Sequence, residues 1–549
     1  MCLILSVKDV RVMISAAEAM VKCLEKEGVS AVYGYPGAAI CPFYDELYKS
    51  DIHHVLVRHE ANAGHAANGY ARMTNRPAVC IATSGPGATN LITAIATAYM
   101  DSVPIVCITG QVASDQIGCD VFQEADITGS AEPFVKYSYL VKNAADIPKI
   151  FKEAFYIAGT GRKGPVLIDI PMDVQKEMIE FDYPETVHMR TYKPTVKGNP
   201  MQIKKICEAV SKAERPLICA GGGVFLAGAE EALRKFTEKT GIPAVSTMMG
   251  LSLYPTNHPL YFGMLGMHGV KSANEAVSRC DTMILIGARV GDRAVKSPKF
   301  LAKTTKIIHI DIDPAEIGKN IPVDYPLVGD CRTILEDMTA AMPEMNCKSW
   351  VSELSEIKNT APDTNETEGF INPKMFLKKL SSILPDNTVC VADVGQNQIW
   401  ACNNFEMKNG RFLTSGGMGT MGYSVPAAVG AKMASPDSEV IVICGDGSFQ
   451  MQMMELATIV QENIAVKIIL MKNTYLGMVR ELQTNQYGDR KIAVGLDGSP
   501  DFVKLVSAYG IPAERVETMA EAEAAAERLK NAKGPYFIEC NVYKYETTL

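Results

Sequence analysis

Residues 438–479 constrain the fold of this chain most, because two predicted strands there enclose a sharp glycine turn and a helix. Residues 439–444 are apolar and rich in β-branched side chains, which predicts a buried strand. The chain then turns at residues 445–448 (Gly-Asp-Gly-Ser), and residues 450–461 have the spacing of a helix. Residues 465–470 predict a second buried strand. This order predicts two adjacent parallel strands, and open α/β sheets bind ligands at the carboxyl ends of such strands.

The turn and the end of the second strand together predict a magnesium and diphosphate site. A glycine on each side of Asp446 lets the backbone approach a bulky anion, and the following helix directs free N–H groups at that anion. Asp446 offers a carboxylate oxygen and Asn473, 27 residues later, an amide oxygen. Mg²⁺ prefers oxygen ligands and shares them with phosphates. A tight turn with an unrelated loop asparagine is the alternative, and the strand–turn–helix–strand context disfavours it.

The rest of the chain repeats the alternation of strands and helices, which predicts an α/β fold with three doubly wound parallel-sheet domains. The length of 549 residues suits three or four domains. Polar, proline-bearing or acidic stretches mark the linkers, and the first residues are a frayed extension or follow an upstream start codon. We expect domains at residues 13–182, 200–340 and 370–549, with linkers at 183–199 and 341–369 and an extension at 1–12.

Composition excludes several classes of partner. The net charge of −8 disfavours a nucleic-acid backbone. Fifteen cysteines without a CxxC pair indicate reduced thiols, so we expect a cytoplasmic protein rather than a disulfide or zinc framework. No apolar run reaches the roughly 18 residues that span a bilayer, so we expect no membrane partner.

The middle of the chain has dinucleotide-like organisation. A predicted strand over 217–220 enters Gly221-Gly222-Gly223, and one over 282–286 leads to Gly287-Ala288-Arg289. The glycine run does not complete GxGxxG, so this signal alone is weak.

Specific strings in consistent order carry a resemblance over nearly the whole chain. The 445–473 stretch resembles the thiamin-diphosphate-binding motif, in which the second of two asparagines binds the metal; here Lys472 replaces the first and Asn473 is the second. The chain resembles acetolactate synthase catalytic subunits, which are thiamin-diphosphate-dependent enzymes. The further strings are Gly34-Tyr-Pro-Gly37, Arg58-His-Glu60, residues 83–90, Thr109-Gly-Gln-Val112, Phe122-Gln-Glu-Ala-Asp126, Met264-Leu-Gly-Met-His-Gly269 and Ser415-Gly-Gly-Met-Gly-Thr-Met-Gly422.

The resemblance implies a transferase, a carboligase that decarboxylates a 2-keto acid such as pyruvate. Joining to a second 2-keto acid then gives 2-acetolactate, a step of branched-chain amino acid biosynthesis. It also implies pyrimidine-binding, central FAD-binding and diphosphate-binding domains, with thiamin diphosphate, Mg²⁺ and a structural FAD. Each active site would lie between two chains of a homodimer or tetramer, and a small regulatory subunit is left open.

By this resemblance Glu60 is the most consequential side chain. A carboxyl group near the pyrimidine N1′ supports general acid–base catalysis through the cofactor. A surface glutamate that opens a helix is the alternative, whereas a zincin motif fails because residue 63 is alanine. Met421 resembles the apolar wedge that holds the cofactor bent, and the backbone carbonyl of Tyr475 would be a further metal ligand. Core packing is the alternative for Met421.

The same resemblance assigns the remaining candidate residues. Catalytic or substrate-pocket positions are Gly37, Ala38, Phe122, Gln123, Arg293 and Met478. Further positions for thiamin diphosphate are Tyr35, Pro36, Thr83, Pro86, Asn90, Gly395, Gln396, Gly419, Gly445, Gly447, Ser448, Leu476 and Gly477. Positions for FAD are Arg162, Gly222, Met267, His268, Arg289, Asp311 and Asp330, and a satisfied loop histidine is the alternative for His268.

The substrate pocket departs from the family more than the cofactor machinery does. The family usually has tryptophan at Leu482 and lysine at Met172, so we expect more room and weaker discrimination here. One apolar change alters discrimination by roughly 1–3 kcal/mol. Further departures are Ala38, Ala61 and Gly291. They fit either drift within acetolactate synthases or a related enzyme with another donor or acceptor.

Three alternatives follow from this. A keto-acid decarboxylase or a ligase with another acceptor keeps the first steps, and a flavin-using pyruvate oxidase needs a flavin that accepts electrons. A non-catalytic flavin- or diphosphate-binding regulatory protein is different in kind, and the presence of Glu60 argues against it.

Overall fold

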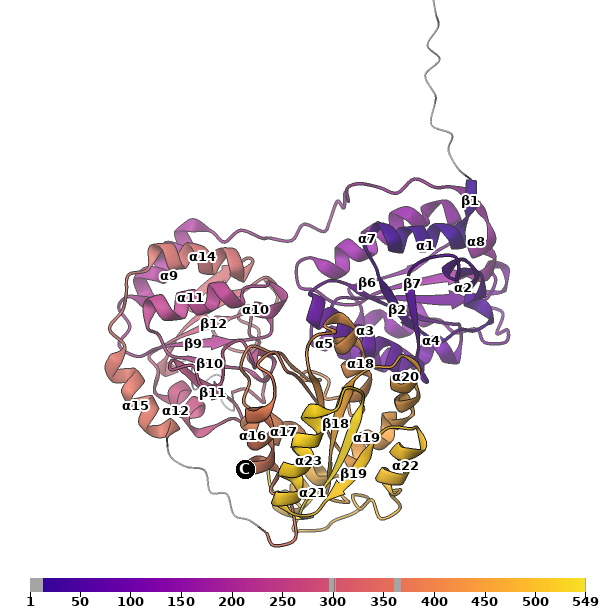
Figure 1. The fold of residues 1–549 in the computed structure, drawn as a ribbon. Helices are drawn as coiled ribbons and strands as arrows, with labels where there is room; N and C mark the ends of the chain where they lie inside the picture. The colour runs from indigo at the N-terminus through magenta and orange to yellow at the C-terminus, as the bar shows by residue number, and fades with distance from the viewer. Residues whose placement is uncertain (1–12, 296–300, 302, 360–366, 549) are drawn as a thin grey trace, which may run out of the picture. The chain divides into compact units, whose positions relative to one another are not determined.

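Three six-stranded sheets organise the part of the chain that the structure describes, and every strand pairing within them is parallel. The computed structural model describes residues 13–295, 301, 303–359 and 367–548 (Figure 1). The predicted α/β class with several parallel-sheet domains is therefore confirmed. The chain forms two compact units, residues up to 71 with 76–193, and residues 72–75 with 194 onward, which are described separately.

The first sheet has the order β3-β2-β4-β5-β7-β6, and its β4 and β5 are buried throughout. Its strands are β2 (Ala31–Gly34), β3 (His53–Leu56), β4 (Ala78–Ala82), β5 (Ile105–Gln111), β6 (Tyr137–Leu140) and β7 (Val166–Pro171), with a separate antiparallel pair of β1 (Met13–Ser15) and β8 (Met178–Glu180). Its helices are α1 (Ala16–Lys26), α2 (Cys41–Leu47), α3 (Glu60–Thr74), α4 (Pro86–Asn90), α5 (Ile92–Met100), α6 (Ile127–Ala131), α7 (Ile147–Gly159) and α8 (Met172–Lys176).

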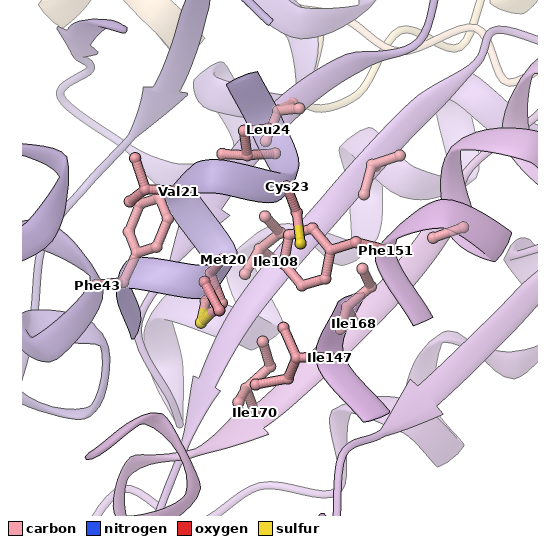
Figure 2. Close-up of a cluster of buried hydrophobic side chains, with 14 of the residues drawn as sticks. Met20, Val21, Cys23, Leu24, Phe43, Ile108, Ile147, Phe151, Ile168 and Ile170 are labelled. Atoms are coloured by element: carbon pink, nitrogen blue, oxygen red, sulfur yellow. The ribbon is translucent and has the colours of Figure 1, made fainter. Parts of the chain in front are cut away.

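Helix α1 shows how the sequence builds this layer. Ser15 caps it by accepting a hydrogen bond from the Glu18 N–H (3.0 Å), a common way to satisfy a free donor at a helix start. Figure 2 shows the apolar face of α1 against α7 and the strands beneath. The buried side chains labelled there are Met20, Val21, Cys23, Leu24, Phe43, Ile108, Ile147, Phe151, Ile168 and Ile170.

The second unit holds the other two sheets, of order β11-β10-β9-β12-β13-β14 and β16-β15-β17-β18-β20-β19. The central strands are β9 (Pro216–Ala220), β10 (Ala244–Ser246), β11 (Tyr261–Met264), β12 (Thr282–Ile286), β13 (Lys306–Asp311) and β14 (Tyr325–Val328). The central helices include α9 (Pro200–Val210), α10 (Gly223–Leu226), α11 (Glu230–Thr240), α12 (Lys271–Arg279), α14 (Cys331–Ala341) and α15 (Lys348–Lys358).

The last sheet carries the stretch that constrained the fold most. Both faces of β17 and β18 are buried, as expected of parallel strands with helices on either side. Its strands are β15 (Val389–Ala392), β16 (Phe412–Leu413), β17 (Val440–Gly445), β18 (Val466–Lys472), β19 (Ala513–Val516) and β20 (Tyr536–Asn541). Its helices are α16 (Pro373–Ile383), α17 (Gln396–Asn404), α18 (Ser424–Ala434), α19 (Asp446–Gln452), α20 (Leu456–Gln461), α21 (Gly477–Gln486), α22 (Phe502–Ala508) and α23 (Met519–Asn531).

One helix differs in extent from the sequence expectation, and one expected linker contains a helix. The predicted helix over 450–461 is wrong in extent, because α19 begins at Asp446 and a 3₁₀ turn at Met453–Glu455 separates it from α20. The range 341–369, expected to be a linker, contains α15, whose Trp350 is 2% exposed and donates from Nε1 to Pro216 O (3.1 Å). The expected extension at 1–12 lies outside the described residues.

Strand order places a switch point in each sheet. In the last sheet the chain passes from β15 to β16 on one side and then returns to β17 on the other side of β15. The switch point of this sheet therefore lies between β15 and β17. The first sheet changes direction in the same way between β2 and β4, and the central sheet between β9 and β12. Ligands of open α/β sheets bind outside the carboxyl ends of the strands at such points.

Candidate active site

The carboxyl ends of β17 and β18, next to the switch point of the last sheet, carry Asp446 and Asn473. Asp446 follows β17 directly and Asn473 follows β18, and these strands pair in parallel with Gly445 opposite Met471. The Thr474 N–H donates to Asp446 Oδ2 (2.6 Å). The carboxylate therefore contacts the residue that comes immediately after the asparagine.

The electrostatics of Asp446 suit a cation. Asp446 is 1% exposed. Burial raises the pKa of its carboxyl group to about 6, although the N–H groups that donate to the carboxylate act in the opposite direction. A neighbouring cation favours the charged form of a buried carboxyl group. Among the described residues no group of three or more His, Cys, Asp or Glu side chains could hold a metal. A carboxylate, an amide oxygen and a backbone carbonyl are oxygen ligands of the kind that would fit Mg²⁺ if it shared its other ligands with a diphosphate.

Asn473 is oriented by residues far away in the sequence. It is 7% exposed, its Nδ2 donates to Gln396 Oε1 (3.0 Å), and its Oδ1 accepts from the Tyr475 N–H (3.0 Å). Gln396 Nε2 in turn donates to Glu481 Oε2 (2.9 Å) and to Glu546 O (2.8 Å). The amide of Gln396 thus links the asparagine to helix α21 and to the C-terminal segment.

Position 477, at the start of α21, requires glycine because Gln396 and Asn473 pack closely against it. A Cβ added at Gly477 would overlap Gln396 Oε1 and would lie 2.8 Å from Asn473 Nδ2. Thr474 adopts φ +61°, an unusual conformation for a β-branched residue, and such strain clusters at functional sites.

The Gly-Asp-Gly turn lies against the proposed apolar wedge. A Cβ at Gly447 would lie 2.7 Å from Leu476 Cδ2 and 3.5 Å from Met421 Cε, so both side chains border the turn. The Gly445 N–H donates to Ser448 Oγ (3.2 Å), which closes the turn at the start of α19. Around Gly419 (φ +68°) no atom comes within 4 Å of an added Cβ.

A second group of candidate residues gathers at the switch point of the first sheet. Asn90 Nδ2 donates to Glu60 Oε2 (2.9 Å) at the start of α3. A Cβ at Gly87 would lie 3.3 Å from Glu60 Oε1, and one at Gly37 would lie 2.5 Å from Thr83 Cβ. The loops after β2 and β4 therefore meet beside a half-buried glutamate. Tyr35, Pro36, Ala38 and Pro86 are exposed on these loops.

The loop that carries Phe122 and Gln123 packs on this region. Phe122 is 87% exposed and Gln123 adopts φ +59°. A Cβ at Gly85 would lie 2.8 Å from Gln123 O. Buried polar residues hold the end of the loop, because Gln111 Nε2 donates to Ala125 O (2.8 Å) and to Asp169 Oδ2 (2.9 Å).

The other predicted pocket residues differ in how far they are exposed. Met478 is half-buried on α21, where Leu482 is 44% exposed. Arg293 is largely exposed and donates from Nη1 to Met267 Sδ (3.3 Å). Met172 is half-buried at the start of α8. Ala61 is buried, and an added Cβ at Gly291 meets no atom of the described residues within 4 Å.

The central sheet has the strand order of dinucleotide-binding folds. Counted along the chain its order is 3-2-1-4-5-6, and at its switch point a Cβ at Gly221 would overlap Gly287 O. His268 Nδ1 is buried without a hydrogen-bond partner among the described residues. Burial, and then Arg293, lower the pKa of His268.

The remaining flavin candidates have local contacts. Asp330 caps α14 by accepting from the Arg332 N–H (2.9 Å), and Asp311 Oδ1 accepts from the Asp313 N–H (2.9 Å). A Cβ at Gly222 would lie 3.1 Å from Met249 Cβ. Arg289 is half-buried, and Arg162, in the other unit, donates from Nε to Ser102 Oγ (3.0 Å).

Comparison with known proteins accounts for nearly the whole chain. Residues 14–130 match the N-terminal TPP binding domain of thiamine pyrophosphate enzymes, residues 203–338 their central domain and residues 393–540 their C-terminal TPP binding domain. A probable acetolactate synthase large subunit of Methanocaldococcus jannaschii is 47% identical over 95% of this chain and 91% of its own length. The chain belongs to the acetolactate synthase family. A probable large subunit of Methanococcus aeolicus (45%, over 96% and 91%) and the acetolactate synthase of Arthrospira platensis (44%, over 97% and 95%) agree.

For this acetolactate synthase family member, sequence reasoning missed the polar residues behind the site. Asp169, Glu481 and Asp393 all bond to predicted site residues or to the loops that carry them. An aspartate inside the apolar run of β7, or directly after β15, was the available signal.

Proposed function

We propose that this protein is the catalytic chain of an acetolactate synthase, which decarboxylates pyruvate and joins the two-carbon product to a second 2-keto acid. The observation that carries the proposal is that Asp446 and Asn473 follow the carboxyl ends of the paired strands β17 and β18, where the Thr474 N–H donates to Asp446 Oδ2. Membership of the acetolactate synthase family supports the substrate class and favours acetolactate over the decarboxylase and oxidase alternatives.

The chain's own residues divide the work between binding and proton handling. Asp446, the Asn473 amide oxygen and the Tyr475 carbonyl would hold Mg²⁺. When bound, thiamin diphosphate supplies the electron sink for breaking and making the carbon–carbon bonds. Gly447 and the N-terminus of α19 would receive the diphosphate, while Met421 would orient the rings.

Glu60 would hold and transfer a proton at its carboxyl group as general acid–base. The Asn90 amide orients that group through Oε2. We expect Gln123 and Phe122, on the strained loop nearby, to contact the substrate, and Arg293 to pair with its carboxylate.

Several features remain part of the proposal. The dinucleotide strand order and the unpartnered His268 Nδ1 support a structural FAD in the central domain. The name "large subunit", which several relatives carry, supports a small regulatory subunit, and the family resemblance supports a homo-oligomer with sites completed between chains. We also keep the three domain boundaries as a proposal.

The fourteen free cysteines of the described residues support a cytoplasmic location. No helix among the described residues has both the length and the apolar character of a membrane span.

Product analysis tests the proposal. The purified protein, supplied with thiamin diphosphate, Mg²⁺ and pyruvate, alone and with 2-ketobutyrate, should form acetolactate and the mixed acetohydroxy acid. Acetaldehyde as the sole product would indicate a decarboxylase, and bleaching of a bound flavin by pyruvate would indicate an oxidase. Absence of turnover with any keto acid would refute an enzymatic role.

A further inference from the structure

A buried carboxylate outside the predicted site bonds to the loops that form it. Asp393 follows β15 directly and is 1% exposed. Its Oδ1 accepts from the N–H groups of Val394 (2.8 Å) and Gly422 (2.9 Å). Its Oδ2 accepts from the N–H (2.9 Å) and the hydroxyl group (2.6 Å) of Ser424. Burial raises the pKa of this carboxyl group, and these donors act in the opposite direction by favouring the charged form.

These bonds fix the turn that presents Met421. Helix α18 begins at Ser424 without a side-chain cap of its own, so the Asp393 carboxylate takes the place of an N-cap. The turn before it passes through Gly422 in a left-handed conformation (φ +86°). Because Met421 is held between this glycine and the open Gly419 segment, its position depends on Asp393.

Asn397 extends the same contacts to the Gly-Asp-Gly turn. It is 4% exposed, and its Nδ2 donates to Asp393 O (2.7 Å) and to Ile443 O (3.2 Å). A Cβ at Gly445 would lie 3.0 Å from Asn397 Oδ1. The Asp393 N–H also donates to Ile443 O (2.8 Å). The loops after β15 and β17 are thus bonded to each other at the switch point.

We propose that Asp393 is a positioning residue for the cofactor site, which holds the Met421 turn and the Gly-Asp-Gly turn in one arrangement. The inference rests on the function proposed above. It needs an aspartate and not an asparagine, because each carboxylate oxygen accepts from two donors and an amide NH₂ in place of either oxygen would face two of the four donors. Among the described residues the hydrogen-bond partners of its side chain are Val394, Gly422 and Ser424, which are not proposed metal ligands, so Asp393 acts through Met421 and through the turn at Asp446.

The test compares full-length wild type with Asp393→Asn, Ser424→Ala and the control Asp501→Asn. Asp501 is another helix-capping aspartate of the same domain, which accepts from the Lys504 N–H at the start of α22. Calorimetry at saturating Mg²⁺ measures thiamin diphosphate binding, and kinetics measures kcat and KM for pyruvate. For Asp393→Asn we expect Kd to rise about tenfold and kcat to fall at saturating cofactor, with KM for pyruvate little changed. For Ser424→Ala, which removes one of four donors, we expect Kd to rise about threefold.

Circular dichroism shows whether each variant folds. A folded Asp393→Asn whose Kd and kcat equal those of Asp501→Asn would overturn the inference. If Asp393→Asn does not fold, Ser424→Ala decides, and wild-type affinity in that variant would overturn the inference as well. Wild type that binds no thiamin diphosphate would instead refute the proposed function, so the two failures are distinguishable.

Discussion

Replacing Gly477 by alanine should weaken cofactor binding without unfolding the protein. The new methyl group would lie 2.6 Å from Gln396 Cδ and 2.8 Å from Asn473 Nδ2, which is closer than real Cβ contacts come. Gln396 must therefore move, and its hydrogen bond with Asn473 (3.0 Å) is lost or lengthened. Overpacking of this kind costs about 1–3 kcal/mol, and alanine regains about 1 kcal/mol of helix propensity at the start of α21.

The effect on the site exceeds the effect on the fold, because the displaced groups are the proposed metal ligand and its partner. The lost hydrogen bond costs about 1 kcal/mol, and the amide oxygen of Asn473 is misplaced as well. Together these two effects predict that the Kd for thiamin diphosphate rises about tenfold or more. Calorimetry at fixed Mg²⁺ measures it. Gly534→Ala is the matched control, since its added methyl group meets no atom within 4 Å. A folded Gly477→Ala protein with the affinity of Gly534→Ala would refute the reasoning.

Three further predictions address the other regions. Glu60→Gln should lower CO₂ release from pyruvate by about 10²–10⁴-fold while calorimetry still detects bound thiamin diphosphate, and unchanged turnover would contradict the acid–base role. Burial raises the pKa of Asp169 from 3.8 to about 7, so the native state binds this proton more tightly than the unfolded state does. The resulting stability, at most about 4 kcal/mol, is fully present below the unfolded pKa and is lost as pH rises through 7. Urea unfolding of Asp169→Asn should therefore show a flatter pH dependence than wild type between these values, and an unchanged slope would argue against it. Trp350→Ala should cost about 3–5 kcal/mol of unfolding free energy if α15 belongs to the core of the central domain, whereas a loss under about 1 kcal/mol would mark α15 as a peripheral linker helix.

Local sequence was sufficient for much of the fold. Apolar runs at residues 439–444 and 465–470 predicted β17 and β18, and Ser15 marked the start of α1. These signals work because periodicity and capping depend on residues only a few positions apart. The positions of Asp446 and Asn473 directly after β17 and β18 also follow from these local signals, since parallel neighbouring strands end at one edge of the sheet.

Composition and helical spacing did not predict two local features of the structure. The polar, acidic range 341–369 gave no sign of α15 or of the burial of its Trp350 in a hydrophobic cluster. Helical spacing over 450–461 likewise could not show the 3₁₀ turn that separates α19 from α20.

The sequence by itself determined the chemical groups of this protein: a carboxylate and an amide at strand ends, a glutamate at a helix start, and glycines beside them. Only the tertiary structure decided which distant residues hold those groups. Gln396 reaches Asn473 from 77 positions away, and Ser424 reaches Asp393 across 31. Such contacts depend on strand order and on which loops meet at a switch point, and no local pattern of side chains specifies either one.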